Sequence, residues 1–249
     1  HRPYCPDATY HGIFNETISA QVVKDYIREV QGIGSKAMFY NLAYGALKDG
    51  KEDGVKPEWQ VYIDSTDVSP YKHVLKYGKS DIFIQNPANA EWQDYLVKRT
   101  REVYQDFKFD GFHVDQLGSA PGYHVMENGN KVEKASRLST KDGKEVLLWD
   151  GYSPLLTKLH NDQDKKELVM NQVSNWGHTV VATNPNIHTV YVEVWWKKFA
   201  AFSHYMNENQ EVAPNKPVVF AAYTHCEGAQ GAFNIPSVLV SDAFIFAIG

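Results

Sequence analysis

The sequence predicts an α/β fold, a (β/α)8 TIM-type barrel that is incomplete in this chain. Segments with the pattern of strands alternate with amphipathic helices, which is typical of a parallel sheet. The strand segments are almost continuously apolar, as expected when both faces of a sheet are covered. About six βα units are visible, whereas a complete barrel of ~250 residues normally holds eight.

In the first half of the chain, a capped helix precedes the first strand. Ser19 is a suitable N-cap, the apolar positions from Val22 to Val30 form one stripe, and Gly32 and Gly34 end the helix. The predicted segments are, in order, a loop at 1–16, this helix at 19–32, a strand at 36–43, a polar insertion at 45–80 with a strand-like run at 60–63, and a helix at 86–107 that begins at Asn86.

The second half continues the alternation around a second polar insertion at about 119–150. Within it, Asn128-Gly129-Asn130 is typical of a hairpin turn. Helices are expected from Ser153, around Phe199–Met206 and over 234–241. The predicted strands are 109–115, 167–173, 188–195, 218–223 and 243–248. We therefore expect a single barrel domain over 1–249, truncated at both ends.

Composition and charge argue against several classes of function. The chain of 249 residues has a net charge of −5 and no basic cluster, which argues against nucleic-acid binding. No run approaches the ~18 apolar residues of a membrane-spanning helix, and no glycine-rich nucleotide motif follows a strand. His225-Cys226-Glu227 lacks a second pair at ligand spacing, so we expect neither a metal nor a cofactor. Cys5 and Cys226 can form one disulfide or remain two free thiols.

The segment Phe109–Gly118 (FDGFHVDQLG) contains the most informative strand. Phe112 and Val114 are apolar and alternate with His113 and Asp115, so the strand has one buried row and one polar row. It ends at Asp115, and the carboxyl ends of strands are where α/β enzymes carry their catalytic groups. The alternative is an aspartate that starts a turn or caps a helix.

A second strand, 188–195 (HTVYVEVW), places a carboxylate among valines. Tyr191, Glu193 and Trp195 share one face of this strand. An isolated carboxylate is too costly to bury, so Glu193 either has a cationic partner in a buried salt bridge or lines a polar cavity. In a barrel, the second possibility puts Glu193 at the mouth, beside the other strand ends.

Asp115 and Glu193 are therefore expected to converge on one cleft. Glycoside hydrolysis needs this combination: one carboxyl group protonates the leaving oxygen, and another acts on the opposite side of the anomeric carbon. His113 either contacts the sugar, or supports Asp115 as a protonated ring that keeps the carboxylate ionised, or is a hydrogen-bonded core residue. Further side chains at strand ends are expected to contact substrate: Tyr40, Asn41, Gln116, Asn171, Tyr191, Trp195 and Tyr223.

Six motifs in order resemble glycoside hydrolase family 66. They are KAMFYNLAYGA (36–46), NPANAEWQDYL (86–96), FDGFHVDQLG (109–118), YVEVW (191–195), VVFAAY (218–223) and FNIPSVLVSDAFIFAIG (233–249). The resemblance runs from about Ile18 to Gly249. That family comprises endo-dextranases and cycloisomaltooligosaccharide glucanotransferases. The resemblance thus implies an enzyme whose catalytic barrel is flanked by further domains.

By this resemblance, Asp115 is the nucleophile and Glu193 the acid/base of a retaining endo-glycosidase. It would hydrolyse α-1,6-glucosidic linkages in dextran by double displacement. Two alternatives stay open: a transglycosylase of the same family that forms cycloisomaltooligosaccharides, and a carbohydrate-binding barrel without turnover. The expected partner is an α-glucan polysaccharide or oligosaccharide. Because such a polymer cannot enter a cell, we expect a secreted, cell-surface or periplasmic protein.

Overall fold

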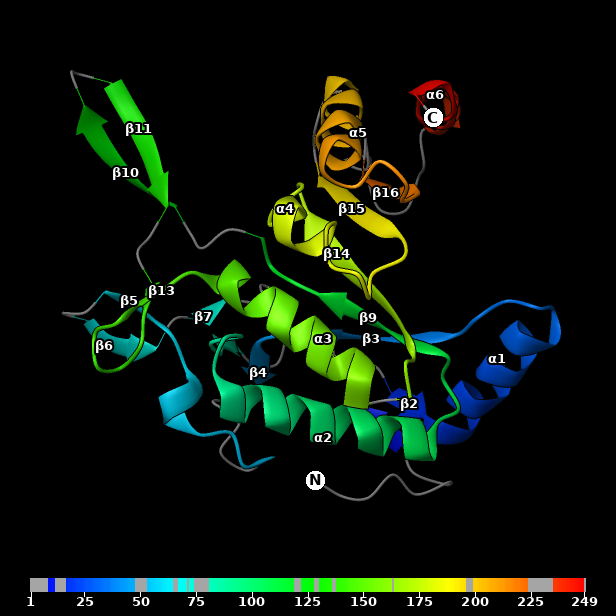
Figure 1. The fold of residues 1–249 in the computed structure, drawn as a ribbon, viewed down its shortest axis with the longest axis horizontal. Coiled ribbons are helices and arrows are strands. Elements are labelled where there is room, and N and C mark those ends of the chain that lie inside the picture. The colour runs from blue at the N-terminus through cyan, green and yellow to red at the C-terminus, as the bar shows by residue number, and fades with distance from the viewer. Residues whose placement is uncertain are drawn as a thin grey trace.

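The fold is built on one parallel sheet of five strands (Figure 1). The computed structural model describes residues 9–11, 17–47, 53–64, 67–70, 72–73, 81–118, 122–127, 130–135, 138–162, 164–195, 199–223 and 235–248. The strands of the main sheet lie side by side in the order β3 (Met38–Leu42), β9 (Gly111–Asp115), β14 (Glu167–Val173), β15 (Val190–Trp195) and β16 (Val218–Tyr223). Order in space follows order along the chain, and helices alternate with the strands. The predicted α/β fold, an incomplete barrel, is therefore confirmed.

Helices cover the outer face of this sheet. Their bounds are α1 (Ala20–Gly32), α2 (Ala90–Asp106), α3 (Tyr152–Asp162), α4 (His178–Val181), α5 (Ala200–Val212) and α6 (Ile235–Ile248). Helices α2 and α3 lie side by side, and α5 packs beside β15 and β16 (Figure 1). The Ser19 hydroxyl accepts a hydrogen bond from the backbone N–H of Val22, and the Asn89 side chain accepts one from that of Trp92. These caps satisfy backbone donors at the starts of α1 and α2.

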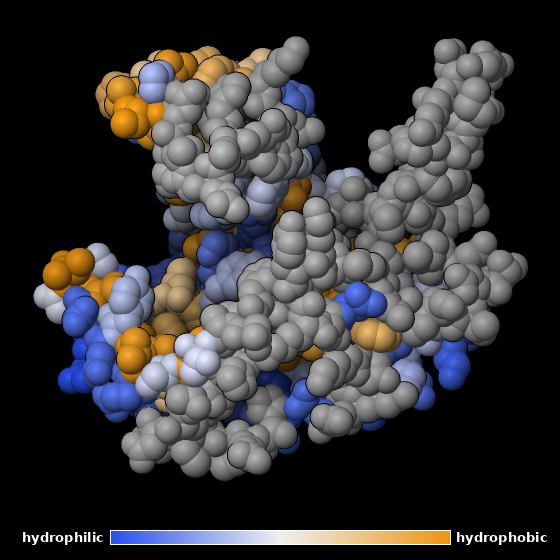
Figure 2. Space-filling model, turned by 180° about the vertical axis from the view of Figure 1, so that it is seen from behind, coloured by the Kyte–Doolittle hydropathy of each residue, from blue (hydrophilic) through white to orange (hydrophobic). Residues whose placement is uncertain are grey.

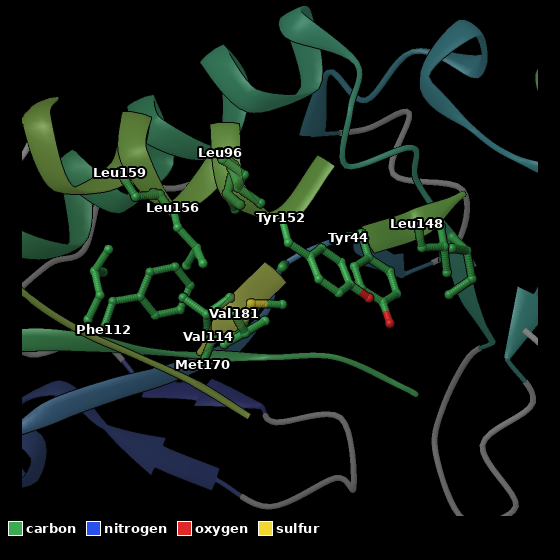
Figure 3. Close-up of a cluster of buried hydrophobic side chains, with 14 of the residues drawn as sticks. Tyr44, Leu96, Phe112, Val114, Leu148, Tyr152, Leu156, Leu159, Met170 and Val181 are labelled. Carbon is green, nitrogen blue, oxygen red and sulfur yellow. The ribbon is translucent and has the colours of Figure 1, made fainter. Parts of the chain in front are cut away.

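The main hydrophobic core lies between the sheet and helices α2 and α3 (Figure 3). Phe112 and Val114 of β9 and Met170 of β14 pack with Leu156 and Leu159 of α3, and all five side chains are buried. Each fully buried large apolar side chain stabilises the fold by about 1.5–3 kcal/mol. This packing determines which face of β9 is apolar. The polar row of the strand must therefore point to the opposite face.

The two polar insertions contain short antiparallel strands, and strands from both insertions share one small sheet. β5 (Tyr62–Asp64) of the first insertion pairs with β12 (Leu138–Ser139) of the second. The remaining short elements of both insertions and their borders are β4 (Gly45–Leu47), η2 (Pro57–Trp59), β6 (Asp67–Pro70), β7 (Lys72–His73), β8 (Ile82–Ile84), β10 (Gly122–Glu127), β11 (Asn130–Ala135), β13 (Glu145–Val146) and η3 (Leu148–Gly151). β10 and β11 form the predicted hairpin, in which Glu127 pairs with Asn130; Asn128 and Gly129 lie outside the described residues.

The predicted strand at 243–248 is wrong, because these residues are the last part of helix α6. Phe244, Ile245 and Ile248 lie at helical spacing and pack toward the cluster that includes Phe199 and Phe202 at the start of α5. A short run that is apolar on every side has no period that separates a strand from a buried helix. Tertiary packing against α5 decides in favour of the helix.

Two boundaries also differ from the prediction. Part of the expected loop at 1–16 is β1 (Thr9–His11), which pairs with β2 (Thr17–Ser19). Helix α2 begins at Ala90 rather than at Asn86, because Asn86 belongs to a turn that precedes it. The Asn86 carbonyl accepts from the N–H of Asn89, and its side-chain oxygen accepts from the N–H of Ala88.

Among the described residues, β3 and β16 are the two edges of the sheet, so the barrel does not close within them. Near the β16 edge, helix α6 exposes large apolar side chains, which give the orange area at the upper left of Figure 2. They include Ile235, Leu239 and Phe246. Unpaired strand edges and apolar surface of this kind favour association. No described helix has both the length and the apolar character needed to cross a membrane.

We predict that Gly151→Ala destabilises the protein, because residue 151 has no room for a side chain. A Cβ there would lie 2.2 Å from the carbonyl carbon of Pro87 and 2.3 Å from the backbone nitrogen of Ala88. We expect a loss of about 1–3 kcal/mol in the free energy of unfolding, measured by urea titration. Gly32→Ala is the control, since this helical position has open space around it and should gain up to ~1 kcal/mol. Equal stability of the two variants would contradict this packing.

Candidate active site

Three strands present polar side chains on the sheet face opposite the α2–α3 core. Asp115 is the last residue of β9, Asn171 lies in β14, and Glu193 lies in β15. The parallel register pairs Asn171 with Tyr191 and Val173 with Glu193. Because side chains alternate along a strand, Asp115, Asn171 and Glu193 share one face. The structure therefore brings the two predicted carboxylates together.

The side chain of Asn171 bridges these two carboxylates. Its Nδ2 donates to Asp115 Oδ1 at 2.8 Å and to Glu193 Oε2 at 2.9 Å. Asn171 is only 3% exposed, so bulk water does not compete strongly for its N–H groups. Both hydrogen bonds start at one nitrogen, which holds the two acceptor oxygens near each other.

Asp115 has a hydrogen-bond donor at each carboxylate oxygen. Besides the amide of Asn171 at Oδ1, the hydroxyl of Tyr40 donates to Oδ2. Such donors matter because Asp115 is only 8% exposed and a buried carboxylate without partners is costly. Desolvation of the Tyr40 hydroxyl, and then its hydrogen bond to Asp115, raises the pKa of Tyr40 well above its ordinary value. Tyr40 therefore stays protonated and remains a donor.

His113 lies one repeat before Asp115 on the same face, between two tyrosine rings. The ring centroid of His113 is 5.6 Å from that of Tyr40 and 4.7 Å from that of Tyr191, both edge-on. Burial lowers the pKa of His113, although the negative charges of the two carboxylates oppose this effect. Its Nε2 is buried and has no hydrogen-bond partner among the described residues. The lowered pKa of His113 favours a neutral ring over the protonated ring that was expected to keep Asp115 ionised.

Aromatic side chains line the Glu193 side of the site. Trp195 and Tyr223 pair across β15 and β16, and their rings are stacked with 4.0 Å between centroids and 6° between planes. Tyr191 and Trp195 flank Glu193 on the same face of β15. Carboxylates bordered by aromatic surface form the kind of lining that small-molecule and sugar sites use.

Asn41, which was expected at the site, lies on the opposite face of the sheet. It follows Tyr40 on β3, so the two side chains point in opposite directions. The Asn41 side-chain oxygen accepts from the backbone N–H of Leu42 at 2.9 Å, and Asn41 lines a cavity beside α2. The strand period separates the two residues, and only Tyr40 reaches Asp115.

Gln116 was also expected to contact substrate, but its side chain makes its hydrogen bonds within the protein. It is 1% exposed, and its Nε2 donates to the carbonyls of Asn171 and Trp176, both at 2.9 Å. Its Oε1 accepts from the hydroxyl of Tyr152 at 3.0 Å. These bonds use both ends of the amide, so Gln116 holds the backbone around the site and is not a sugar ligand.

Two tyrosines that support the site were missed in the sequence. Tyr44 accepts a hydrogen bond from the backbone N–H of Leu117 at 2.7 Å, and Tyr152 holds Gln116. Their rings lie nearly parallel, with 6.1 Å between centroids (Figure 3). Tyr44 lies in the motif KAMFYNLAYGA, and this position could have indicated that it belongs to the site. Nothing in the sequence near Tyr152 indicated a contact with the loop after Asp115.

His225, Cys226, Glu227 and Cys5 lie outside the described residues. Within the part of the chain that the structure describes, no group of three or more His, Cys, Asp or Glu side chains is arranged to hold a metal ion.

Comparisons with known proteins find a family, related sequences and a solved structure of similar fold. The sequence model of glycosyl hydrolase family 66 matches residues 1–249. Two curated cycloisomaltooligosaccharide glucanotransferases from Niallia circulans are 26% and 27% identical over 219 and 223 residues, each match covering 87% of the chain. A crystal structure of a cycloisomaltooligosaccharide glucanotransferase from Paenibacillus sp., complexed with cycloisomaltoheptaose, is similar over 87% of the chain, with a TM-score of 0.73 and 24% identity. The chain spans 22% of each curated relative and 30% of the crystallised chain.

We predict that His113 makes the protein less stable in acid. Because burial lowers the pKa of His113 in the folded state, the unfolded chain binds a proton more readily. Stability that depends on neutral His113 is complete above the pKa of an unfolded histidine, about 6.5, and declines as the pH falls below it. Urea titrations above and below this pH should show a smaller acid-induced loss in His113→Gln than in the unaltered protein. Equal losses would show that His113 is not buried in its neutral form.

Proposed function

The chain belongs to glycosyl hydrolase family 66, and we propose that it carries a retaining endo-glycosidase site for α-1,6-linked glucan. Asp115 and Glu193 are the two catalytic carboxylates of this proposal. The observation that carries it is the pair of hydrogen bonds, 2.8 and 2.9 Å long, that join both carboxylates to one nitrogen of Asn171. The substrate of the proposed reaction is dextran.

The separation of the carboxylates supports retention of configuration. Inverting glycosidases keep their carboxyl groups about 6.5–9.5 Å apart to admit a water molecule, and retaining ones about 5–5.5 Å apart. One oxygen of each carboxylate accepts a hydrogen bond from the same Nδ2, so these two oxygens lie closer together than the separation of inverting enzymes. This arrangement favours direct attack of one carboxylate on the anomeric carbon, with no water between them.

Asp115 suits the role of nucleophile. It ends β9 and its short side chain is held by donors at both oxygens, Tyr40 and Asn171. In the first step an Asp115 oxygen bonds to the anomeric carbon, the glycosidic bond breaks, and Glu193 gives its proton to the leaving oxygen. In the second step Glu193 takes a proton from water, the water oxygen bonds to the anomeric carbon, and Asp115 leaves as a carboxylate.

The aromatic lining supports a sugar as substrate. The stacked pair Trp195 and Tyr223 lies one repeat beyond Glu193, where a ring next to the cleaved bond would pack. Both curated relatives are named cycloisomaltooligosaccharide glucanotransferases, and isomaltooligosaccharides consist of α-1,6-linked glucose units. A polymeric α-glucan is not taken up intact, so we place the protein outside the cytoplasm, as a secreted, cell-surface or periplasmic enzyme.

The second candidate is cyclising transglycosylation, and the names of the relatives favour it. In that reaction the hydroxyl at the far end of the same glucan, rather than water, attacks the glycosyl–Asp115 intermediate. The first step and both carboxylate roles are unchanged. The two candidates therefore differ only in the acceptor.

The acceptor can be identified from the products that the full-length protein forms from dextran. Full length is required, since this chain spans 22% of its curated relatives. Hydrolysis predicts linear isomaltooligosaccharides and a new reducing end for every bond cleaved, by product sizing and reducing-sugar assay. Cyclic products without new reducing ends would establish the transglycosylase instead. Binding of dextran without any product would reject both.

We predict that substitutions of the two carboxylates have different consequences. Asp115→Ala should abolish turnover of every glucoside, because no covalent intermediate can form. Glu193→Gln should lower kcat on dextran by about 10²–10⁴-fold, but should spare the first step on aryl glucosides whose leaving group needs no proton. Steady-state kinetics on dextran and on an activated aryl α-glucoside separate the two cases.

Azide provides the control for this assignment. It should rescue Glu193→Ala and yield a glycosyl azide of retained configuration, whereas Asp115→Ala should yield the inverted azide. The opposite pattern would exchange the roles of Asp115 and Glu193.

A further inference from the structure

Asn171 was expected to contact sugar, but its side chain is already occupied. The Nδ2 group carries two protons, and one is directed to Asp115 Oδ1 and the other to Glu193 Oε2. The opposite rotation of the amide would put its oxygen against two carboxylates, so the observed orientation is the one that the charges impose. No N–H of Asn171 is left for a substrate hydroxyl.

The oxygen of the same amide shows how strongly this orientation is preferred. Asn171 Oδ1 is buried and has no hydrogen-bond partner among the described residues. A buried acceptor without a partner is unfavourable. The amide keeps this unfavourable acceptor while both of its protons bind the carboxylates. The two hydrogen bonds to Asp115 and Glu193 therefore determine the conformation of the Asn171 side chain.

The backbone of Asn171 is restrained as well. Its carbonyl accepts from Gln116 Nε2 at 2.9 Å, and Gln116 is the neighbour of Asp115 in the chain. Gln116 is in turn held by the Tyr152 hydroxyl at 3.0 Å. Asn171 therefore has little freedom to follow a substrate, and it is placed to keep the carboxylates where they are.

From these contacts we propose that Asn171 is a positioning residue that sets the distance between Asp115 and Glu193 through both steps of the reaction. The proposal rests on the proposed function and adds to it the group that maintains the separation. The negative charge passes from Asp115 to Glu193 as the covalent intermediate forms, and Asn171 directs one N–H to each carboxylate, where it can stabilise that charge. By occupying Glu193 Oε2, the amide also leaves Oε1 as the oxygen that transfers the proton.

The test compares Asn171→Leu and Asn171→Ala with the unaltered full-length enzyme on α-glucan. Both variants remove the donors, and leucine nearly preserves the volume. We expect kcat to fall about 100-fold in each, as for a misplacement of catalytic groups by ~1 Å, with KM nearly unchanged.

Gln172→Leu is the matched control. Gln172 is the next residue in β14 and equally buried, but it points to the opposite face, and its side-chain nitrogen and oxygen have no partner among the described residues. This variant should keep the kcat and the KM of the unaltered enzyme. A raised KM with unchanged kcat in the Asn171 variants would show that Asn171 binds sugar. A loss of thermal stability with an unchanged kcat in the Asn171 variants would show a merely structural role, and either result overturns the proposal.

Crystal structures of the unaltered protein and of Asn171→Leu separate this proposal from the proposed function. If Asn171 positions the carboxylates, at least one of them should turn away from its original place in the variant, whether or not the protein cleaves α-glucan. Unchanged carboxylate positions would overturn the positioning role even in an active enzyme. Absence of turnover in the unaltered full-length protein would reject the proposed function alone.

Discussion

The two hydrogen bonds that Asn171 donates to Asp115 and Glu193 are the interaction on which the candidate site depends. In the proposed reaction one negative charge passes between these carboxylates, and Asn171 directs one N–H to each of them. The parallel register of β9, β14 and β15 places Asn171 between the two carboxylates, because Asp115, Asn171 and Glu193 lie on the same face of neighbouring strands. The apolar core on the other face, around Phe112 and Met170, holds that register in place.

The ends of the strands are also tied to one another. Ser174 and Asn175 follow β14 with positive φ values of 50° and 64°, a conformation that non-glycine residues keep only when their surroundings hold it. The N–H of Ser174 donates to the carbonyl of Glu193 at 2.8 Å. Asn175 donates to Glu208 at 2.7 Å and accepts from Asn209 at 2.6 Å, which links this turn to α5. Contacts with α5, which lies outside the site, therefore stabilise the strained backbone next to the carboxylates.

Local periodicity was enough to predict the sheet and its carboxylates, but not the partners of each side chain. The strand period placed Asp115 and Glu193 on polar rows, and the alternation of elements predicted their parallel neighbours. The same period separates Asn41 from Tyr40, yet both were expected at the site because each ends a strand. Gln116 was misjudged because its partners lie far along the chain. Residues 243–248 had no period at all, so only contacts with α5 could identify the helix.

We propose that the fold holds Asp115 and Glu193 close enough together for double displacement. The most direct measurement is the anomeric configuration of the first product, followed by proton NMR as the full-length enzyme cleaves dextran. Double displacement at this site predicts that the new reducing end appears first as the α-anomer and only later mutarotates to the β-anomer. Initial release of the β-anomer would mean a single displacement by water, and it would contradict a covalent intermediate on Asp115.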